Sequence, residues 1–242
     1  MKIVAMSDQH GHLPDVEPCD LLIVAGDQCP DVIGGMAARH DPERQWRWFM
    51  DVWMPWRRRQ PVESCVVTWG NHDYCGEQHR RMALIEGPQR TVIACDELVE
   101  IAGLRIWLTP WSNTFMKWAF MRDPETLARY YAAIPDGVDI LVSHQPPLGY
   151  GSQCRYLDPR DGQMKEEQVG SAELTAAVVR ARPRAVVCGH VHSGFGRYEC
   201  DQIPVYNVSV VDEGYSLAHS PTLMELSQSD PAVESVVESG KG

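Results

Sequence analysis

Residues 65–73 read Cys-Val-Val-Thr-Trp-Gly-Asn-His-Asp, an apolar run that ends in a glycine and three polar residues. A short apolar run bounded by such a turn signal is typical of a buried β-strand, so Asn71, His72 and Asp73 should lie at its carboxyl end. At average residue usage, Gly-Asn-His-Asp occurs by chance in a chain of this length about once in a thousand. An amide oxygen, an imidazole and a carboxylate are therefore expected together at the end of one strand.

Polar residues follow four other short apolar runs in the same way. These residues are Asp8 and His10 after 2–6, Asp27 after 21–25, His144 after 139–143, and His190 with His192 after 185–188. Loops at the carboxyl edge of an α/β sheet converge on one crevice. We therefore expect all five clusters to meet at one point, although they are far apart in the sequence.

Strand-like runs alternate with helical segments along the rest of the chain, which predicts an α/β fold. The expected strands are 2–6, 21–25, 65–69, 91–94, 98–108, 139–143, 185–188, 196–200, 204–209 and 221–226, and the expected helices are 42–59, 77–86, 124–133 and 171–182. Hairpin-like segments at 91–108 and 196–209 predict a second, antiparallel-rich sheet packed on the first. We expect a single domain over 1–226 and a flexible tail over 227–242, which is polar and acidic.

Composition excludes several functional classes. The chain has 242 residues, 44% of them hydrophobic, and a formal net charge of −11. An acidic chain without a Lys/Arg stripe is a poor ligand for duplex nucleic acid. No apolar stretch approaches the roughly 20 residues of a membrane helix, and the amino terminus runs into the first polar cluster without room for a signal peptide. The sequence therefore predicts a cytoplasmic protein that binds neither duplex nucleic acid nor membranes, and it leaves a homodimer open.

The candidate ligands combine oxygen and imidazole nitrogen without sulfur: Asp8, His10, Asp27, Asn71, His144, His190 and His192. This set suits Mn²⁺, with Fe, Zn²⁺, Co²⁺ or Ni²⁺ as alternatives, and argues against Ca²⁺ or a thiolate zinc site. Seven ligands are too many for one ion but suit two ions about 3.5–4 Å apart that share a carboxylate. Two aspartates and two divalent ions leave the site near +2, which would attract an anionic phosphate ester.

Taken alone, most clusters have a simpler explanation. Asp8 with His10 could be an ordinary turn, and an aspartate after Gly26 is common turn chemistry. His40, His79 and His219 lack a motif and are expected at the surface, and His12 could lie beside the ligands, at the pocket rim or in solvent. The eight cysteines are expected to be free thiols in a reducing compartment. Cys29 and Cys75 follow Asp27 and Asp73 by two residues and could line the site without binding metal.

The motifs Asp8-x-His10, Gly26-Asp27, Gly70-Asn71-His72-Asp73, Ser143-His144 and Gly189-His190-Val191-His192 together resemble those of the calcineurin-like metallophosphoesterase superfamily. Segments 109–111, 117–120, 143–149 and 192–196 are similar to its small single-domain phosphodiesterases, which include class III cyclic-nucleotide phosphodiesterases and metallophosphoesterase-domain-containing proteins. The resemblance covers residues 2–226. It implies a four-layer αββα sandwich of the metallo-dependent-phosphatase-like type, in which helices flank two mixed sheets and a dinuclear centre lies among the loops.

The resemblance also implies a role for each matching residue. Asp8, His10 and His192 would hold the first metal, Asp27 would bridge, and Asn71, His144 and His190 would hold the second. His72 would face the substrate as a catalytic residue, with Asp73 orienting its ring and Asn71 contacting a phosphate oxygen. Gln145, in place of a common glycine, and the Gly-rich segment 29–40 depart from the family pattern beside the site and could alter substrate choice.

These assignments predict a hydrolase in which a metal-bridging hydroxide attacks phosphorus and His72 assists the leaving oxygen. The expected substrate is a small phosphodiester or phosphomonoester, with cyclic nucleotides suggested by the resemblance alone. Trp111, Tyr150 and Phe195 could stack on an aromatic substrate group or simply pack in the fold. A nuclease or a protein phosphatase would share the ligands, and a non-catalytic metal-binding scaffold or regulatory protein on the same fold is the alternative from another class.

Overall fold

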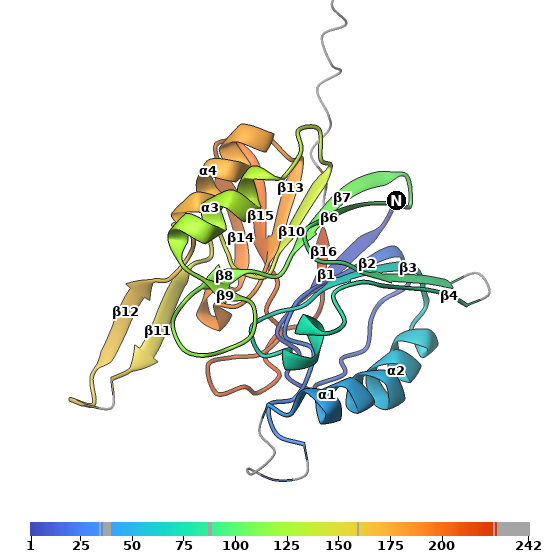
Figure 1. Ribbon diagram of the computed structural model, residues 1–242, viewed down its shortest axis with the longest axis horizontal. Coiled ribbons are helices and arrows are strands. Elements are labelled where there is room, and N and C mark those ends of the chain that lie inside the picture. Colours follow the sequence, from blue (N-terminus) through green and yellow to red (C-terminus); the bar gives the residue numbers. More distant parts are fainter. Residues whose placement is uncertain (34, 36–39, 87–88, 159, 225, 227–242) are drawn as a thin grey trace, which may run out of the picture.

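Two six-stranded sheets stack face to face in the computed structural model, which describes residues 1–33, 35, 40–86, 89–158, 160–224 and 226 (Figure 1). The first sheet has the strand order β16-β1-β2-β3-β5-β4. Its strands are β1 (Ile3–Met6), β2 (Cys19–Ala25), β3 (Val62–Thr68), β4 (Met82–Glu86), β5 (Gln89–Ile93) and β16 (Thr222–Met224). Strands β1, β2, β3 and β5 run parallel, and β4 and β16 are antiparallel edges.

The second sheet has the strand order β14-β15-β13-β10-β7-β6. Its strands are β6 (Glu97–Ile101), β7 (Leu104–Thr109), β10 (Ile140–Ser143), β13 (Ala185–Cys188), β14 (Gly196–Cys200) and β15 (Ile203–Asn207). Here too the central strands are parallel and the edges antiparallel. The parallel strands of each sheet therefore all end at one edge.

The period of two along each strand divides the core into layers. In β1, Ile3 and Ala5 belong to the apolar cluster shared by the two sheets, whereas Val4 and Met6 belong to the cluster that includes the helices. Strands buried on both faces read as continuous apolar runs, which is why these segments were recognisable in the sequence.

Helices cover the outer face of each sheet, which gives the predicted four-layer αββα arrangement (Figure 1). Helix α1 (Pro42–Trp48), the π-helical segment η2 (Phe49–Trp53) and α2 (Met54–Arg59) follow one another beside the first sheet. Helices α3 (Pro124–Ala132) and α4 (Ala172–Ala181) lie on the second. The Asp41, Asp123 and Ser171 side chains cap α1, α3 and α4 by accepting backbone N–H groups. Each cap satisfies a donor that the helix itself cannot pair.

The helix predicted at 77–86 is wrong. The chain forms a short 3₁₀ helix, η3 (Tyr74–Glu77), and then strand β4, which pairs antiparallel with β5. Met, Ala and Leu have high helix propensity, but pairing with the sheet edge overrides it.

The predicted hairpin at 91–108 is also wrong in part. Strand β5 joins the first sheet beside β3, and only β6 and β7 form a hairpin, so the second sheet is parallel at its centre rather than antiparallel-rich.

Besides β4, four strands were not predicted. The pair β8 (Ser112–Asn113) and β9 (Met121–Arg122) is short, and β11 (Gln153–Leu157) with β12 (Met164–Gln168) forms a separate hairpin. The predicted tail at 227–242 lies outside the described residues. No helix in the described part of the chain is long and apolar enough to cross a membrane.

Candidate metal centre

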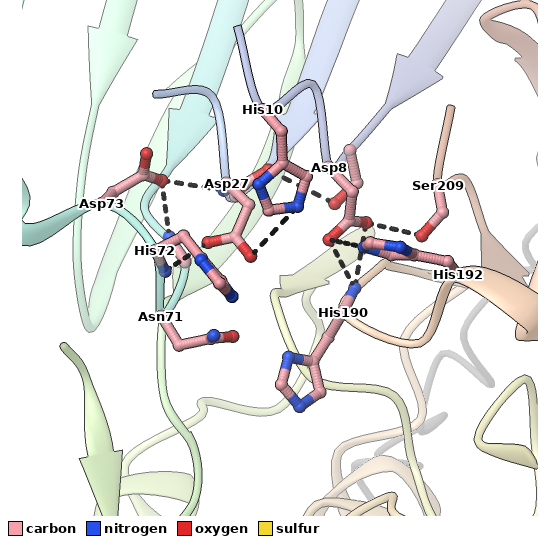
Figure 2. Close-up of polar contacts among 12 residues, drawn as sticks. Asp8, His10, Asp27, Asn71, His72, Asp73, His190, His192 and Ser209 are labelled. Atoms are coloured by element: carbon pink, nitrogen blue, oxygen red, sulfur yellow. Dashed lines mark hydrogen bonds and ion pairs between the residues drawn. The ribbon is translucent and has the colours of Figure 1, made fainter. Parts of the chain in front are cut away.

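The predicted ligands come together at the carboxyl edge of the two sheets, between the loops that follow β1, β2, β3, β10 and β13 (Figure 2). Backbone hydrogen bonds join these loops. The Asp8 N–H donates to the Gly26 carbonyl at 3.0 Å, and the Gly189 N–H donates to the His144 carbonyl at 2.9 Å. The candidate ligands thus meet at one edge that the two sheets share.

Asp8, His10 and His192 form one compact group whose donor atoms all lie within 4.8 Å of one another. The Asp8 carboxylate accepts the His190 backbone N–H at 3.0 Å on each oxygen and the Ser209 hydroxyl at 2.5 Å. His192 donates from Nδ1 to the Asp212 carbonyl at 2.9 Å, and its Nε2 lies 3.6 Å from Asp8 Oδ1. The backbone therefore fixes the tautomer that turns Nε2 toward the carboxylate.

Asp8, Asp27 and His144 form a second group within the same 4.8 Å limit. His144 donates from Nδ1 to the Ala25 carbonyl at 2.9 Å, and its Nε2 lies 3.2 Å from Asp27 Oδ2 and 2.8 Å from Asn71 Oδ1. The His190 ring lies beside that of His144, with the ring centroids 5.0 Å apart. The structure therefore brings all seven predicted ligands to one region, with Asp27 among the imidazoles.

Buried polar atoms without a partner show that these residues fit a metal. Neither ring nitrogen of His10 has a hydrogen-bond partner among the described residues, and the same is true of the Asn71 side-chain nitrogen. Leaving a buried imidazole unpaired is costly, and such groups are rare in folded proteins. Imidazole and carboxylate donors that meet at this distance suit divalent transition metals.

The backbone at the ligands is strained. Asp8, His10, Asp27 and His190 are non-glycine residues in the left-handed region, with φ values of 56°, 42°, 56° and 66°. Such conformations cost about 1–3 kcal/mol each and cluster at functional sites. All four residues lie in the loops that follow β1, β2 and β13.

Glycines at the strand ends leave room for the ligands. A Cβ on Gly70 would lie 2.2 Å from Asp27 Oδ1, and one on Gly189 would lie 2.2 Å from Asp8 Oδ2 and 1.9 Å from Ser7 Oγ. Neither position tolerates a side chain without moving a predicted ligand. This close approach explains the glycine that precedes the ligand in both motifs.

Burial and the two carboxylates act differently on the pKa values of the individual imidazoles. Burial lowers the pKa of His10 to about 4 and that of His190 to about 3, so both imidazoles are unprotonated near neutrality. Burial would also lower the pKa of His144, but the Asp27 and Asp8 carboxylates raise it to about 9. Burial opposes ionisation of Asp27, and the imidazoles around it outweigh that effect and hold its pKa well below the usual range. In the absence of metal, a proton on His144 thus supplies positive charge that a bound cation would otherwise provide.

The predicted role of Asp73 is wrong. Its carboxylate accepts backbone N–H groups from Asp27, Cys29 and Gly70 at 2.8, 2.9 and 2.9 Å and does not contact the His72 ring. Asp31 takes that role instead, with its Oδ1 2.7 Å from His72 Nδ1. Asp73 shapes the loop that carries Asp27, because a buried carboxylate collects backbone donors. The sequence signal for Asp31 was only an acidic residue four positions after Asp27.

The aromatic residues near His72 also differ from those predicted. The Trp118 ring centroid lies 4.6 Å from that of His72, and the Tyr215 ring lies 4.6 Å from His10 and 5.2 Å from His192. Trp111, in contrast, is buried and stacks on Tyr130 at 4.6 Å, so it belongs to the core. The sequence contained both Trp118 and Tyr215 but no periodicity that placed them at the site.

The other aromatic candidates pack in the fold. Phe195 stacks on His219 with the ring centroids 3.8 Å apart, and Tyr150 packs on the core. His40 is not a plain surface residue, because it stacks on Tyr74 at 4.6 Å and its Nε2 lies 3.5 Å from Asp31. His12 donates to the Tyr215 carbonyl at 2.9 Å and so supports the loop over the site.

Three residues flagged beside the site have structural contacts. Cys29 and Cys75 are buried with their sulfur atoms 3.8 Å apart. Gln145 is buried, accepts the Asn113 N–H at 2.8 Å and donates to the Val169 carbonyl at 2.8 Å. All three side chains therefore join neighbouring loops.

Comparisons with known proteins agree with this geometry. The family model described as calcineurin-like phosphoesterase matches residues 1–194. Metallophosphoesterase domain-containing protein 1 of Homo sapiens is 30% identical over 197 residues, which cover 71% of this chain and 57% of that protein. A UPF0046 protein of Caenorhabditis elegans is 25% identical over 247 residues, with 93% of this chain and 81% of that one covered. A solved structure superimposes with a TM-score of 0.58 at 14% identity over 93% of this chain and 99% of the other, which shows a shared fold.

This chain therefore spans 57% of the length of the human relative.

Proposed function

Because this chain belongs to the calcineurin-like phosphoesterase family, whose members are metal-dependent, we propose that it hydrolyses small phosphate esters at a centre of two divalent ions. Asp8, His10 and His192 would hold one ion, Asn71, His144 and His190 the other, and Asp27 would bridge them. When bound, two such ions activate water and neutralise charge on the phosphoryl oxygens. The supporting observation is the His10 imidazole, which is buried beside two carboxylates without a hydrogen-bond partner among the described residues.

His72 would donate the proton that the leaving oxygen needs. The His72 Nδ1 is hydrogen-bonded to Asp31, so Nε2 is the atom that would carry the transferable proton. Burial would lower the pKa of His72, but Asp27 and Asp31 outweigh burial and raise it, which favours the charged form of the ring. A charged imidazole is the form that a general acid requires. Asp31 is a positioning residue in this scheme.

Trp118 and Tyr215 would exclude water from this proton transfer. Their rings pack against the His72 and His10 rings at 4.6 Å in each case. Shielding from water strengthens the ion pair between His72 and Asp31 and keeps the proton on the intended atom.

Hydrolysis of bis(p-nitrophenyl) phosphate with added Mn²⁺ tests the proposal. The reconstituted protein should bind two ions per chain and release p-nitrophenol, and Asp27→Asn should lose both properties together. Asp201→Asn, which changes an exposed carboxylate in a surface ion pair, is the matched control and should retain both. A protein that binds one ion or none, or that binds two without hydrolysing any phosphate ester, would contradict the proposal.

The substrate class needs a panel, because diesterases and monoesterases can share the same ligands. p-Nitrophenyl phosphate, bis(p-nitrophenyl) phosphate, and 2′,3′- and 3′,5′-cyclic nucleotides separate the alternatives. We expect at least one of these esters to be hydrolysed, with cyclic nucleotides as candidate natural substrates.

A further inference from the structure

The β11–β12 hairpin projects from the body of the molecule as a separate two-stranded sheet (Figure 1). It exposes large apolar side chains: Leu157 is 60% and Met164 is 66% accessible. An isolated hairpin is marginal in water, and exposed apolar clusters mark binding sites. Contacts with the body of the molecule must therefore stabilise the hairpin, and its exposed apolar residues indicate a binding surface.

One face of the hairpin carries an ion pair and an apolar pair. Arg155 lies opposite Glu166 and Leu157 lies opposite Met164, and opposed residues that are two positions apart share a face. The Arg155 Nε is 2.8 Å from Glu166 Oε1. The charge on this face is thus already paired, and Leu157 with Met164 remains as its apolar part.

Ser193 fastens this hairpin to the candidate metal centre. Its hydroxyl donates to the Gln153 carbonyl at 3.0 Å and accepts the Arg155 N–H at 3.1 Å. Its own N–H donates to Glu213 Oε1 at 2.8 Å. Ser193 directly follows the predicted ligand His192 in the 3₁₀ helix η4 (His192–Gly194), so three segments are held together beside that ligand.

A cavity of about 540 Å³ lies where these segments meet, lined by Arg155, Tyr156, Leu157, Met164, Ser193, Glu213 and Gly214. We call it the hairpin cavity. Two of its lining segments adjoin residues of the metal centre in the sequence: Ser193 follows His192, and Gly214 precedes Tyr215, whose ring contacts His10 and His192. The Asp212 carbonyl that orients His192 belongs to the same loop.

We propose that the hairpin cavity binds an uncharged, apolar organic group of the phosphate ester while the phosphoryl group occupies the metal centre. This inference rests on the proposed function. The two charged lining groups are engaged already, Arg155 with Glu166 and Glu213 with the Ser193 N–H, so the cavity offers no unpaired charge from either of them to a charged substituent. Its volume lies within the range of small-molecule sites.

Binding of methylphosphonate and hexylphosphonate to the Mn²⁺-loaded protein, measured by isothermal titration calorimetry, tests the inference. Each fully buried methylene strengthens binding by about fourfold, so hexylphosphonate should bind at least about tenfold more tightly than methylphosphonate even if the chain is only partly covered. Leu157→Ser and Met164→Ser should each reduce this preference severalfold and leave methylphosphonate affinity unchanged.

Leu223→Ser is the matched control, because Leu223 is 57% exposed but lies on strand β16 of the first sheet. It should keep the full preference for the longer chain. A preference that is absent in the natural sequence, or that survives in Leu157→Ser and Met164→Ser, overturns the inference. Analytical ultracentrifugation adds a further outcome: if the natural sequence is dimeric and these two variants are monomeric, the apolar face belongs to a second copy and the inference fails.

The two proposals fail separately. If the loaded protein prefers hexylphosphonate but hydrolyses no phosphate ester, the proposed function is wrong and the cavity still binds an apolar chain. If it hydrolyses bis(p-nitrophenyl) phosphate but shows no preference, only the cavity assignment is wrong. A loaded protein that binds neither phosphonate contradicts both.

Discussion

The proton that His72 would deliver depends on a carboxylate outside the metal-ligand set. Asp31 Oδ1 lies 2.7 Å from His72 Nδ1, in a site where nearby side chains exclude much of the solvent. A bond of this kind fixes the orientation of the ring and raises the pKa of the imidazole. Asp31 Oδ1 also lies 4.0 Å from Nδ1 of the predicted ligand His10, so metal content has to be measured beside the rate to separate an effect on the proton from an effect on metal binding.

Asp31→Asn should shift the alkaline limb of the pH–rate profile to lower pH. Without the carboxylate, the His72 imidazolium loses a stabilising charge, its pKa falls, and the acid form disappears sooner as the pH rises. The rate near neutral pH should fall about tenfold or more. Rates measured from pH 5 to 10, with metal content by mass spectrometry, check this. An unshifted profile would show that Asp31 does not act through His72. Loss of metal in the variant would show that Asp31 supports the metal centre instead.

Gly189→Ala should weaken metal binding by about tenfold or more. The new Cβ would meet Asp8 Oδ2 at 2.2 Å, so the carboxylate has to move from its bonds to Ser209 and the His190 N–H. Gly214→Ala, where the nearest atom lies 3.2 Å from the added Cβ, is the control. Equal metal affinities in the two variants, by calorimetric titration with Mn²⁺, would contradict this account of the glycine.

The convergence of the seven candidate ligands could be predicted from the sequence because each follows an apolar strand, and strand ends are fixed by the hydrophobic pattern. Asp31 and Tyr215 could not, because they lie in irregular loops whose path depends on the assembled fold. The assignment of Asp73 failed for the same reason. Adjacency to His72 in sequence suggested contact, whereas the turn directs the carboxylate toward the backbone of 27–29.

Among the elements, the π-helical segment η2 links the outer helices to the ligand loop. Trp53 is fully buried, stacks on Phe49 at 4.7 Å, and donates from Nε1 to Gln9 Oε1 at 2.9 Å. Gln9 lies between the predicted ligands Asp8 and His10, and its Nε2 donates to the His12 carbonyl. Packing of this segment on the first sheet therefore sets the loop that carries two ligands.

Trp53→Phe should lower the free energy of unfolding by about 1–3 kcal/mol, because Gln9 Oε1 stays buried without its donor while the aromatic packing is largely kept. Chemical denaturation measures this loss, and metal affinity should fall with it. Trp48→Phe, the same substitution at a partly exposed position of α1, should lower the free energy of unfolding by less. Equal losses in the two variants would show that the bond to Gln9 contributes nothing.

Most elements followed from sequence periodicity, and the failures share a cause. Strands buried on both faces and capped helices carry strong local signals, as β13 and α4 illustrate. Strand β4 and the β11–β12 hairpin lie at edges or outside the two sheets. Their pairing is set by partners and by turns more than by an apolar run.

At the scale of the whole molecule, the metal centre gathers carboxylates and imidazoles that would repel or remain unpaired without a cation. In the metal-free protein, a proton on His144 balances part of the negative charge of Asp27 and Asp8. These carboxylates raise the pKa of His144 to about 9, against 6.5 for a free imidazole. A group whose pKa rises on folding stabilises the fold below its unfolded pKa, and that stabilisation is lost as the pH passes its folded value.

The metal-free protein should therefore lose stability between about pH 6.5 and 9, by on the order of 3 kcal/mol from His144. Asp73, whose pKa burial raises to about 7, acts in the same direction up to that pH. Melting temperatures measured from pH 7.5 to 9.5, with and without Mn²⁺, avoid the contribution of Asp73. Loading should raise the melting temperature and flatten its pH dependence. A flat curve in the metal-free protein would contradict the assignment.

Two hydrogen bonds, from the Ser209 hydroxyl to Asp8 and from His192 to the Asp212 carbonyl, determine when the metal centre can form during synthesis. Asp8 leaves the ribosome some two hundred residues before Ser209 and Asp212, whose hydroxyl and carbonyl groups hold Asp8 and His192 in place. A nascent chain should consequently have little hold on a divalent cation until nearly the whole fold has emerged. The number of metal ions bound per chain would then report whether translation and folding are complete, as well as whether the protein can catalyse its reaction.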